Sequence, residues 1–343
     1  MITLLAPRKL ASWTSAKTAI GIDIGQFETK IVALQSKKLT RELAVATVYT
    51  FEDQSEEATP SWNSKTISAL ADRIQLATKT IRDRRSWKVR AAISMEWCDY
   101  RSIFREENSQ SLAAKLGQAL QDTRPRTIVA LPDADQKKIR VFSTSEEQLV
   151  GIGDALHARK LTPESIDGIP WCLYRARRLL DTPIADLEII LDWSFGKPTL
   201  VCVADGKIQC IRRLCGGLGE MSRPQMTEHH LSIRESIRWL QHTLSASEPK
   251  ESVGNFEGQD WINDCCSRIA DQLNTSIEFM QWKNPGKRVS RVWLTGGGAE
   301  TSGLVDRFQA LTTVPIHVWQ TDLFGTQVTP KYAVAVALAM KGL

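Results

Sequence analysis

Ile20-Gly21-Ile22-Asp23-Ile24-Gly25 decides the fold, because here an apolar strand reaches a carboxylate and runs into a glycine turn. A second glycine turn, Leu294-Thr295-Gly296-Gly297-Gly298-Ala299, follows another apolar run about 270 residues further along the chain. Glycine turns at strand ends bring backbone amides close to phosphate groups. The pair of turns, in this order, predicts a nucleotide held between two related halves of the chain.

The second half of the chain repeats the pattern that opens the first half. A predicted strand ends in Asp192, as the first strand ends near Asp23. The next predicted strand, Thr199–Ala204, runs through Asp205-Gly206, a strong hairpin signal, into a third strand at 207–214. The sequence therefore predicts an internal duplication of a strand-turn-strand-strand unit.

Helical periodicity and turn signals divide the rest of the chain around these two units. An amphipathic helix is predicted at 64–83, and a connecting helix at 170–180 follows a small inserted unit. Two further helices are predicted near 227–244 and 260–282. The predicted organisation is an N-terminal arm (1–17), a first lobe (18–102 and 169–187), an inserted subdomain (103–168) and a second lobe (188–343) with a helical insert at about 222–286.

The 343-residue chain has the composition of a folded protein, with 42% hydrophobic and 24% charged residues. Its net charge of +5 permits an anionic partner without requiring one, and no nucleic-acid-binding module accompanies the charge. The seven cysteines form no C-x-x-C motif, and their odd number argues against a disulfide framework, so a reducing cytoplasm is expected. No stretch is as long and as apolar as a membrane span.

Two segments leave more than one interpretation open. The N-terminal arm mixes apolar side chains with Arg8 and Lys9, and it fits either a frayed terminus or a short amphipathic arm on a membrane or partner. A basic cluster fits either a solvated surface turn, which is favoured, or a contact with anionic lipid or an acidic partner. The cluster comprises Arg82, Arg84, Arg85, Lys88 and Arg90.

The first glycine turn carries residue types that bind a phosphate and its metal. Asp23 is expected to hold Mg²⁺ through water, because Mg²⁺ keeps much of its hydration shell. The amides of Gly25, Gln26 and Phe27 can face a phosphate, and Thr29 or Lys30 can meet the phosphate oxygens. The alternative is a buried aspartate that caps a turn, which the D-x-G pattern alone favours.

The second glycine turn has room for a flat ligand. Gly296, Gly297 and Gly298 admit backbone conformations closed to other residues, and they let a base and ribose approach. A helix predicted to begin around Thr301 directs its N-terminus toward the ligand. The alternative is a flexible loop, but a loop between a strand and a helix is where α/β folds bind ligands.

Together these residues resemble the actin-like ATPase superfamily and, within it, the PilM family of type IV pilus assembly proteins, which is related to FtsA. The resemblance rests on 21–25 with Lys30, on 293–299 with Ser302-Gly303-Leu304, and on the small-residue ending at 332–339. It implies an α/β fold of two duplicated RNase H-like lobes, the actin-like fold, with a small inserted subdomain of the type called 1C. It covers nearly the whole chain.

The resemblance also implies ligands and the residues that bind them. ATP and Mg²⁺ are the implied cofactors, with Asp23 and Asp192 at the metal. The second phosphate loop corresponds to 192–199, where Ser194 takes a glycine position and Pro198, which has no amide to donate, stands where a hydroxyl is expected. The implied nucleotide-binding residues are Asp23, Gly25, Gln26, Phe27, Thr29, Lys30, Asp192, Ser194, Thr199, Glu235, Arg238, Gly296, Gly297, Gly298 and Ala299.

By the same resemblance, the protein is expected to be a cytoplasmic scaffold that binds ATP between its lobes and the tail of a PilN-like inner-membrane protein. Peripheral association with the inner membrane through such partners is expected, and self-association into a filament is left open. No catalytic residue is assigned, and the altered second phosphate loop favours at most a weak ATPase. Two alternatives remain: an interaction module of a pilus or type II secretion system that no longer binds nucleotide, and a small-molecule kinase of the same superfamily.

Overall fold

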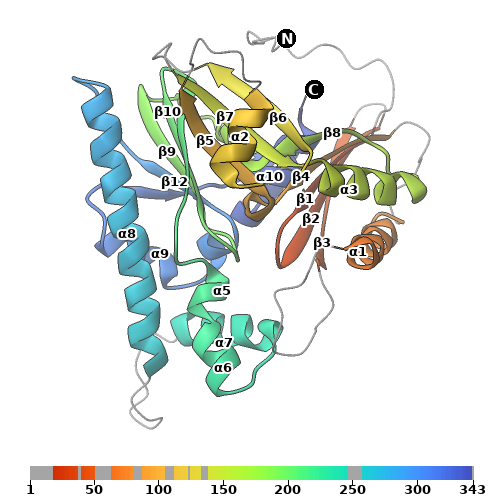
Figure 1. The fold of residues 1–343 in the computed structure, drawn as a ribbon. Helices are drawn as coiled ribbons and strands as arrows, with labels where there is room; N and C mark the ends of the chain where they lie inside the picture. The colour runs from red at the N-terminus through yellow and green to blue at the C-terminus, as the bar shows by residue number, and fades with distance from the viewer. Residues whose placement is uncertain are drawn as a thin grey trace.

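The protein folds around two five-stranded sheets, with a smaller third sheet and a group of helices beside them (Figure 1). The computed structural model describes residues 18–37, 40–50, 63–79, 87–104, 112–122, 124–132, 138–245 and 257–341. The arm predicted at 1–17 lies outside these residues, as do Arg82, Arg84 and Arg85 of the predicted basic cluster.

The first sheet is built around β1 (Thr18–Ile24), the strand that carries the opening glycine motif. Its strand order is β3-β2-β1-β4-β8; β2 is antiparallel to both β1 and β3, and β4 and β8 run parallel to β1. All residues of β1 are buried, as in a central strand whose two faces are both covered. The other strands are β2 (Glu28–Lys37), β3 (Thr40–Tyr49), β4 (Trp87–Ile93) and β8 (Pro163–Gly168).

The second sheet repeats the first, with β9 in the place of β1. Its order is β11-β10-β9-β12-β13, and its pairings have the same directions as those of the first sheet. Asp192 ends β9 and Asp23 lies next to the end of β1, so the matching central strands carry matching carboxylates. The predicted duplication is confirmed. The strands are β9 (Leu187–Asp192), β10 (Thr199–Ala204), β11 (Lys207–Arg213), β12 (Val292–Thr295) and β13 (Ile316–Val318).

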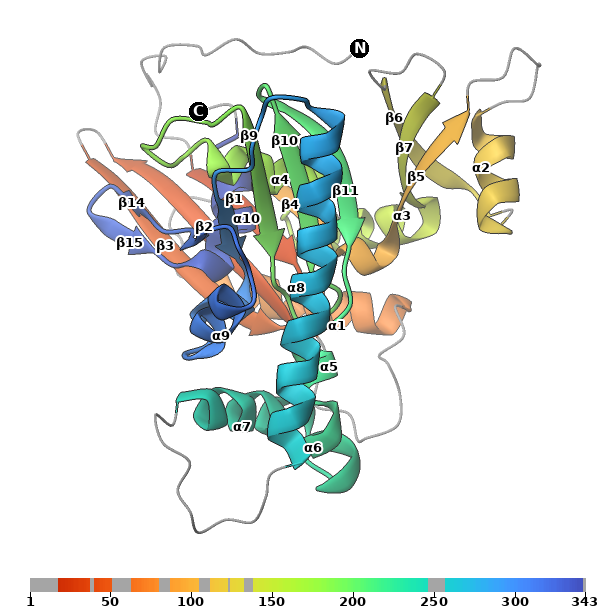
Figure 2. The same ribbon diagram turned by 90° about the vertical axis from the view of Figure 1, so that its left-hand side faces the viewer.

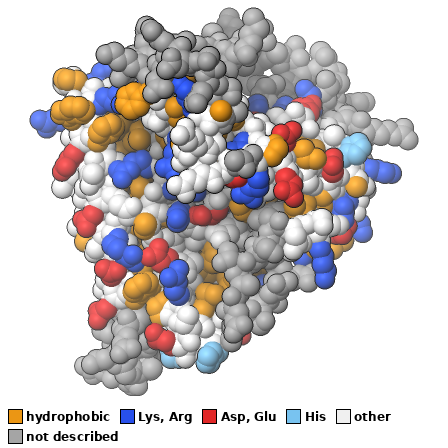
Figure 3. All heavy atoms as spheres, in the orientation of Figure 1, with side chains coloured by type: hydrophobic (Ala, Val, Ile, Leu, Met, Phe, Trp, Pro, Cys, Tyr) orange, Lys and Arg blue, Asp and Glu red, His pale blue; other side chains and the backbone are white. Residues whose placement is uncertain are grey.

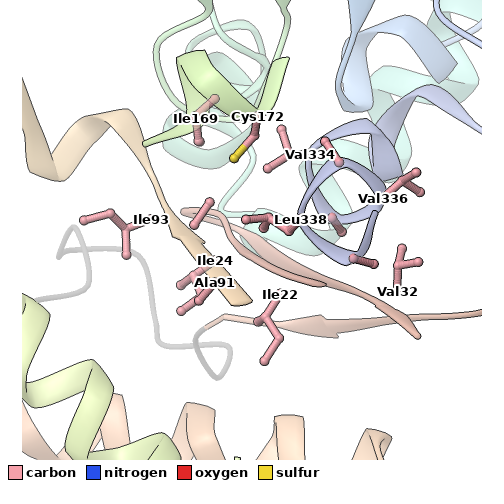
Figure 4. Close-up of a cluster of buried hydrophobic side chains, with 14 of the residues drawn as sticks. Ile22, Ile24, Val32, Ala91, Ile93, Ile169, Cys172, Val334, Val336 and Leu338 are labelled. Carbon is pink, nitrogen blue, oxygen red and sulfur yellow. The ribbon is translucent and has the colours of Figure 1, made fainter. Parts of the chain in front are cut away.

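Helix α10 (Ala333–Ala339), at the end of the chain, packs on the first sheet against α4 (Ile169–Arg177). Its seven residues are all buried. Gly21 of β1 lets the two backbones meet, because a Cβ there would overlap the carbonyl oxygen of Ala335 and lie 2.7 Å from the Ala339 nitrogen. Figure 4 shows this core, with Ile22, Ile24, Val32, Ala91, Ile93, Ile169, Cys172, Val334, Val336 and Leu338 labelled.

A third sheet, of order β5-β7-β6, stands at the side of the molecule with α2 (Figure 2). It is the small inserted subdomain that the sequence predicted. The strand pairing differs from the limits of 103–168 predicted for the insert. Strand β8 lies inside that range but pairs with β4 of the first sheet. The elements are β5 (Cys98–Phe104), α2 (Leu112–Leu120), β6 (Arg126–Pro132), β7 (Lys138–Ser145) and α3 (Glu146–Ala158).

Most of the remaining helices belong to the second lobe. Helix α8 (Glu257–Lys283) runs along it for 27 residues and buries Cys265, Ile269 and Leu273 in the second core. Helices α5, α6 and α7 lie together below the sheets (Figures 1 and 2). Their bounds are α5 (Leu218–Met221), α6 (Arg223–Glu228) and α7 (Ile233–Ser245). Within the described residues, the remaining α-helices are α1 (Ser64–Ala77) and α9 (Leu304–Ala310).

Shorter elements finish the chain. A hairpin that the sequence did not predict, β14 (Thr321–Leu323) and β15 (Thr326–Val328), precedes α10. The 3-10 turns among the described residues are η2 (Met95–Trp97), η3 (Gly297–Glu300) and η4 (Pro330–Tyr332). No helix within the described part of the chain is both long enough and apolar enough to cross a bilayer. The face shown in Figure 3 mixes basic and acidic side chains.

Candidate functional site

Asp23, Lys30 and Asp192 come together where the central strands of the two sheets end. The pairing of β1 with β2 places Lys30 opposite Asp23, and its ammonium lies 3.9 Å from Asp23 Oδ2. The positive charge of the same ammonium also acts on the carboxyl of Asp192 and favours its ionised form. Because Asp23 and Asp192 belong to different sheets, Lys30 serves two carboxylates that the fold brings from both lobes.

Both carboxyl groups are buried, and burial is the main reason that their pKa values are raised. The pKa of Asp23 rises to about 6, because desolvation disfavours the carboxylate; Lys30 opposes this rise and Asp192 adds to it. The pKa of Asp192 is also raised by burial, against the effects of Lys30 and of a hydrogen bond from Thr295. The Thr295 hydroxyl lies 3.1 Å from Asp192 Oδ1. Two carboxyl groups share one ammonium, so the site attracts a further cation.

This donor set fits Mg²⁺. Asp23 Oδ1 is buried and has no hydrogen-bond partner among the described residues, which leaves it available as a ligand. Within the same residues, no three His, Cys, Asp or Glu side chains gather in a way that could hold a metal ion. Mg²⁺ accepts such a site, because it commonly binds through one or two carboxylates and completes its shell with water and phosphate oxygens.

The first glycine turn is supported by threonine side chains. The buried Thr29 hydroxyl lies 3.0 Å from that of Thr50, and the Thr50 hydroxyl donates to the Gly25 carbonyl at 2.7 Å. Thr29 therefore holds the turn in this structure. Glycine is required at position 25, because a Cβ there would lie 2.5 Å from the Glu28 carbonyl oxygen; the same Cβ would lie 3.2 Å from Lys30 Nζ.

The predicted second phosphate loop, at 192–199, lies directly against the first glycine turn. The rings of Phe27 and Phe195 stack with centroids 5.0 Å apart and an angle of 22° between their planes. Gly196 approaches Gln26 so closely that a Cβ would overlap the Gln26 amide oxygen. The backbone N–H of Lys197 donates to Glu96 Oε1 at 2.7 Å. The structure thus brings the two predicted phosphate loops together.

Ser194 and Thr199 flank this contact within the second loop. The Ser194 carbonyl accepts a hydrogen bond from the Leu218 N–H at 3.1 Å, and the Phe195 carbonyl accepts one from Gly219 at 2.8 Å. The loop therefore caps the beginning of α5. Thr199 is buried at the start of β10, paired with Asp192 in the register of the sheet.

Two of the three glycines in the second glycine turn pack so closely against Trp193 that a side chain would not fit. Gly296 has a φ of +86°, and a Cβ there would lie 2.6 Å from the Trp193 carbonyl oxygen. A Cβ on Gly298 would lie 2.6 Å from Trp193 Cγ. Gly297 has more space, since a Cβ would meet only Leu218 at 3.5 Å. Ala299 is buried behind the turn. Of the three, Gly297 is the glycine with room beside it for a ligand.

Glu235 and Arg238 lie on the exposed side of α7. The Glu235 carboxylate accepts hydrogen bonds from the Ser232 N–H at 2.9 Å and from its hydroxyl at 2.7 Å, and these bonds lower its pKa. Glu235 therefore caps α7. The role predicted for the pair, nucleotide binding, stays a prediction.

Sequence reasoning missed Glu96. This residue follows β4, the parallel neighbour of β1, and the carboxyl ends of neighbouring strands form the usual binding edge of an α/β sheet. The signal in the sequence is its position just after the run 89–94, whose apolar residues are typical of a short strand. The favoured interpretation of the basic cluster was wrong for Arg90, which is buried, lies 3.2 Å from Glu164 and donates to the Leu338 carbonyl.

No protein-family model matches the sequence, and no curated protein sequence matches it. Among solved structures, the chain is similar to one of the PilM-PilN type IV pilus biogenesis complex, with a TM-score of 0.68 and 19% identity over 94% of this chain and 98% of that one. It is also similar to the ethanolamine utilization protein EutJ from Carboxydothermus hydrogenoformans, with a TM-score of 0.54 and 12% identity over 100% and 93% of the two chains. The protein has the actin-like fold of these structures, in which two duplicated lobes carry an inserted subdomain.

Proposed function

We propose that this protein is a PilM-like scaffold that binds ATP with Mg²⁺ between its lobes and also binds the cytoplasmic tail of an inner-membrane protein. The observation that carries the proposal is the buried pair of Asp23 and Asp192 with Lys30 beside it, at matching strand ends of a duplicated fold. Similarity in fold to a structure of the PilM-PilN complex, over nearly the full length of both chains, supports the kind of partner.

Each residue of the site has a defined task in this proposal. Asp23 and Asp192 hold Mg²⁺, directly or through water, and Lys30 offsets negative charge on the phosphates. The amides of the turn at 25–27 face the phosphate chain, and Gly297 leaves room for the base and ribose. Bound Mg·ATP supplies the cation that the two carboxylates attract and the oxygens that complete its shell. Because the two aspartates come from different lobes, the relative position of the lobes depends on the ligand that they share.

The second phosphate loop favours binding over turnover. Ser194 adds a Cβ at a position where the family has glycine, and Pro198 has no N–H to offer a phosphate oxygen. Phosphoryl transfer depends on closely placed donors around the transferred group, so the loss of such donors lowers the rate of the chemical step. The proposed activity is therefore ligand-dependent assembly in the cytoplasm, next to the inner membrane, with weak hydrolysis at most.

Equilibrium binding of Mg·ATP to the purified protein, measured by calorimetry, tests the nucleotide site. The parent protein should bind, and Asp23→Ala and Gly297→Val should each weaken binding at least tenfold, which corresponds to about 1.4 kcal/mol. The matched control is Asp271→Ala, which removes an exposed carboxylate from α8 and should leave the affinity unchanged. No detectable affinity in the parent would contradict the nucleotide site.

A pull-down with the N-terminal cytoplasmic peptide of a PilN-like protein tests the scaffold role. Binding should occur and should differ between the nucleotide-free and the Mg·ATP-bound protein. Peptide binding without any nucleotide affinity would instead indicate an interaction module that no longer uses ATP. ATP turnover that begins only when a sugar or an organic acid is added would indicate a kinase.

A further inference from the structure

Glu96 connects the first lobe to the second phosphate loop. It lies in η2, the short turn that follows β4, and its Oε1 accepts the Lys197 backbone N–H at 2.7 Å. The residue before it, Met95, accepts a hydrogen bond on its carbonyl from Arg213 of β11 at 3.1 Å. Two consecutive residues of the first lobe therefore bind two separate segments of the second.

The loop fits the carboxylate closely. A Cβ on Gly196 would lie 3.0 Å from Glu96 Oε1 and 3.2 Å from its Cγ, so glycine at this position makes room for the side chain. The same Cβ would overlap the amide oxygen of Gln26, which belongs to the first glycine turn. The Glu96 side chain thus lies beside both loops that are proposed to receive the phosphates.

The turn that carries Glu96 is itself held in place. The Ser94 hydroxyl accepts the Glu96 N–H at 3.3 Å, and the Met95 side chain is buried. The Thr144 hydroxyl donates to the Trp97 carbonyl at 2.7 Å and so anchors the turn to the third sheet. The carboxylate is therefore presented to the loop by a fixed backbone rather than by a free surface segment.

A carboxylate and a phosphate compete for the same donor. Both are anions whose oxygens accept backbone N–H bonds, and such bonds to charged acceptors are stronger than bonds between neutral groups. A phosphate oxygen that takes the Lys197 N–H must displace Glu96. If Glu96 stays nearby, its negative charge also repels the phosphate.

We propose that Glu96 is an internal anion that occupies the phosphate position of the second loop and weakens nucleotide binding until it is displaced. The inference rests on the proposed function and adds a regulatory residue to that site. The same contact joins the lobes, so displacement of Glu96 removes one interlobe bond as the nucleotide enters. Phosphate binding and lobe position are coupled through this one side chain.

Calorimetric titration of Mg·ATP and of adenosine into the parent protein, Glu96→Gln and Glu96→Ala tests the proposal. Both variants should bind Mg·ATP about tenfold more tightly than the parent, because the competing anion is gone. Adenosine has no phosphate, so its affinity should not rise. The control is Glu278→Gln, which neutralises an exposed carboxylate on α8 and should match the parent.

Amide hydrogen exchange, without nucleotide, gives a readout that does not depend on binding. The Lys197 amide should exchange at least tenfold faster in Glu96→Ala than in the parent, while the amides of β9 keep their protection. A parent that binds Mg·ATP, with no gain or with a loss in both Glu96 variants, overturns the inference and leaves the proposed function standing. Absence of Mg·ATP binding in the parent and in both variants overturns the two together.

Discussion

Arg177 and Glu188 form a buried, two-pronged ion pair that joins α4 to the first strand of the second sheet. The guanidinium donates from Nε and Nη2 to the two carboxylate oxygens, each at 2.8 Å. Arg177 also donates from Nη1 to the Thr182 carbonyl and from Nη2 to the Pro183 carbonyl, so each guanidinium nitrogen has at least one partner. The side chains are 1% and 0% exposed. Because both charges are buried, the removal of either side chain would leave the other charge without a counter-ion.

Replacing Glu188 with alanine should destabilise the protein by about 3–5 kcal/mol, because the Arg177 charge would remain buried without its counter-ion. Chemical denaturation measures this free energy of unfolding. Asp72→Ala is the control, since it breaks a pair with Arg159 in which the Asp72 side chain is 64% exposed; this change should cost about 1 kcal/mol or less. Equal losses from the two substitutions would contradict the role assigned to the buried pair.

The first glycine of the opening motif serves packing. Gly21→Ala should destabilise the protein by about 3 kcal/mol, because the new methyl group would overlap the Ala335 carbonyl of α10 and force the helix away from β1. Thermal unfolding provides the measurement. Gly153→Ala, on α3, is the control: a Cβ there meets nothing within 4 Å, and alanine favours helix by up to about 1 kcal/mol. A Gly21→Ala protein as stable as the parent would show that β1 and α10 are not in close contact.

The sequence predicted the fold because its strongest signals are local. Strands that end near Asp23 and at Asp192, each followed by a turn and a second strand, predict the duplication without any tertiary contact. Gly21 shows the limit of such reasoning. The sequence pattern places it in a phosphate motif, whereas its neighbours in the structure are Ala335 and Ala339, more than three hundred residues away in sequence.

The candidate site was predictable only in part, for the same reason. Asp23 and Lys30 face each other across one hairpin, so their contact follows from the strand pairing. The contacts of Glu96 with Lys197 and of Phe27 with Phe195 depend on how two lobes meet, which no local pattern encodes. Trp193 is a further case, because its packing under the second glycine turn is purely tertiary.

The raised pKa of Asp23 makes stability depend on pH. A carboxyl whose folded-state pKa is about 6, against 3.8 in the unfolded chain, favours folding most below pH 4. That contribution is lost as the pH rises through 6. In EDTA, Asp23→Asn should therefore be more stable than the parent by about 2–3 kcal/mol at pH 7.5 and equal to it near pH 4.

Denaturant unfolding of parent and Asp23→Asn across this pH range provides the test. Asp322→Asn is the control, since Asp322 is an exposed residue of β14 whose carboxylate accepts the Gly325 N–H. Its difference from the parent should not follow the same curve. An Asp23→Asn protein that is less stable than the parent at pH 7.5 would mean that the Lys30 attraction outweighs desolvation of the carboxylate.

The stack of Phe27 on Phe195 should hold the two predicted phosphate loops together without a ligand. A double-mutant cycle with Phe27→Ala and Phe195→Ala should give a coupling energy of about 0.5–1.5 kcal/mol, since offset aromatic pairs contribute this much beyond burial. Phe279 and Trp282 provide a comparison, with rings 6.2 Å apart on one exposed face of α8, and their coupling should be smaller. Chemical denaturation of the single and double variants yields both energies. A Phe27–Phe195 coupling of zero would mean that other contacts, such as the Glu96–Lys197 hydrogen bond, keep the loops together alone.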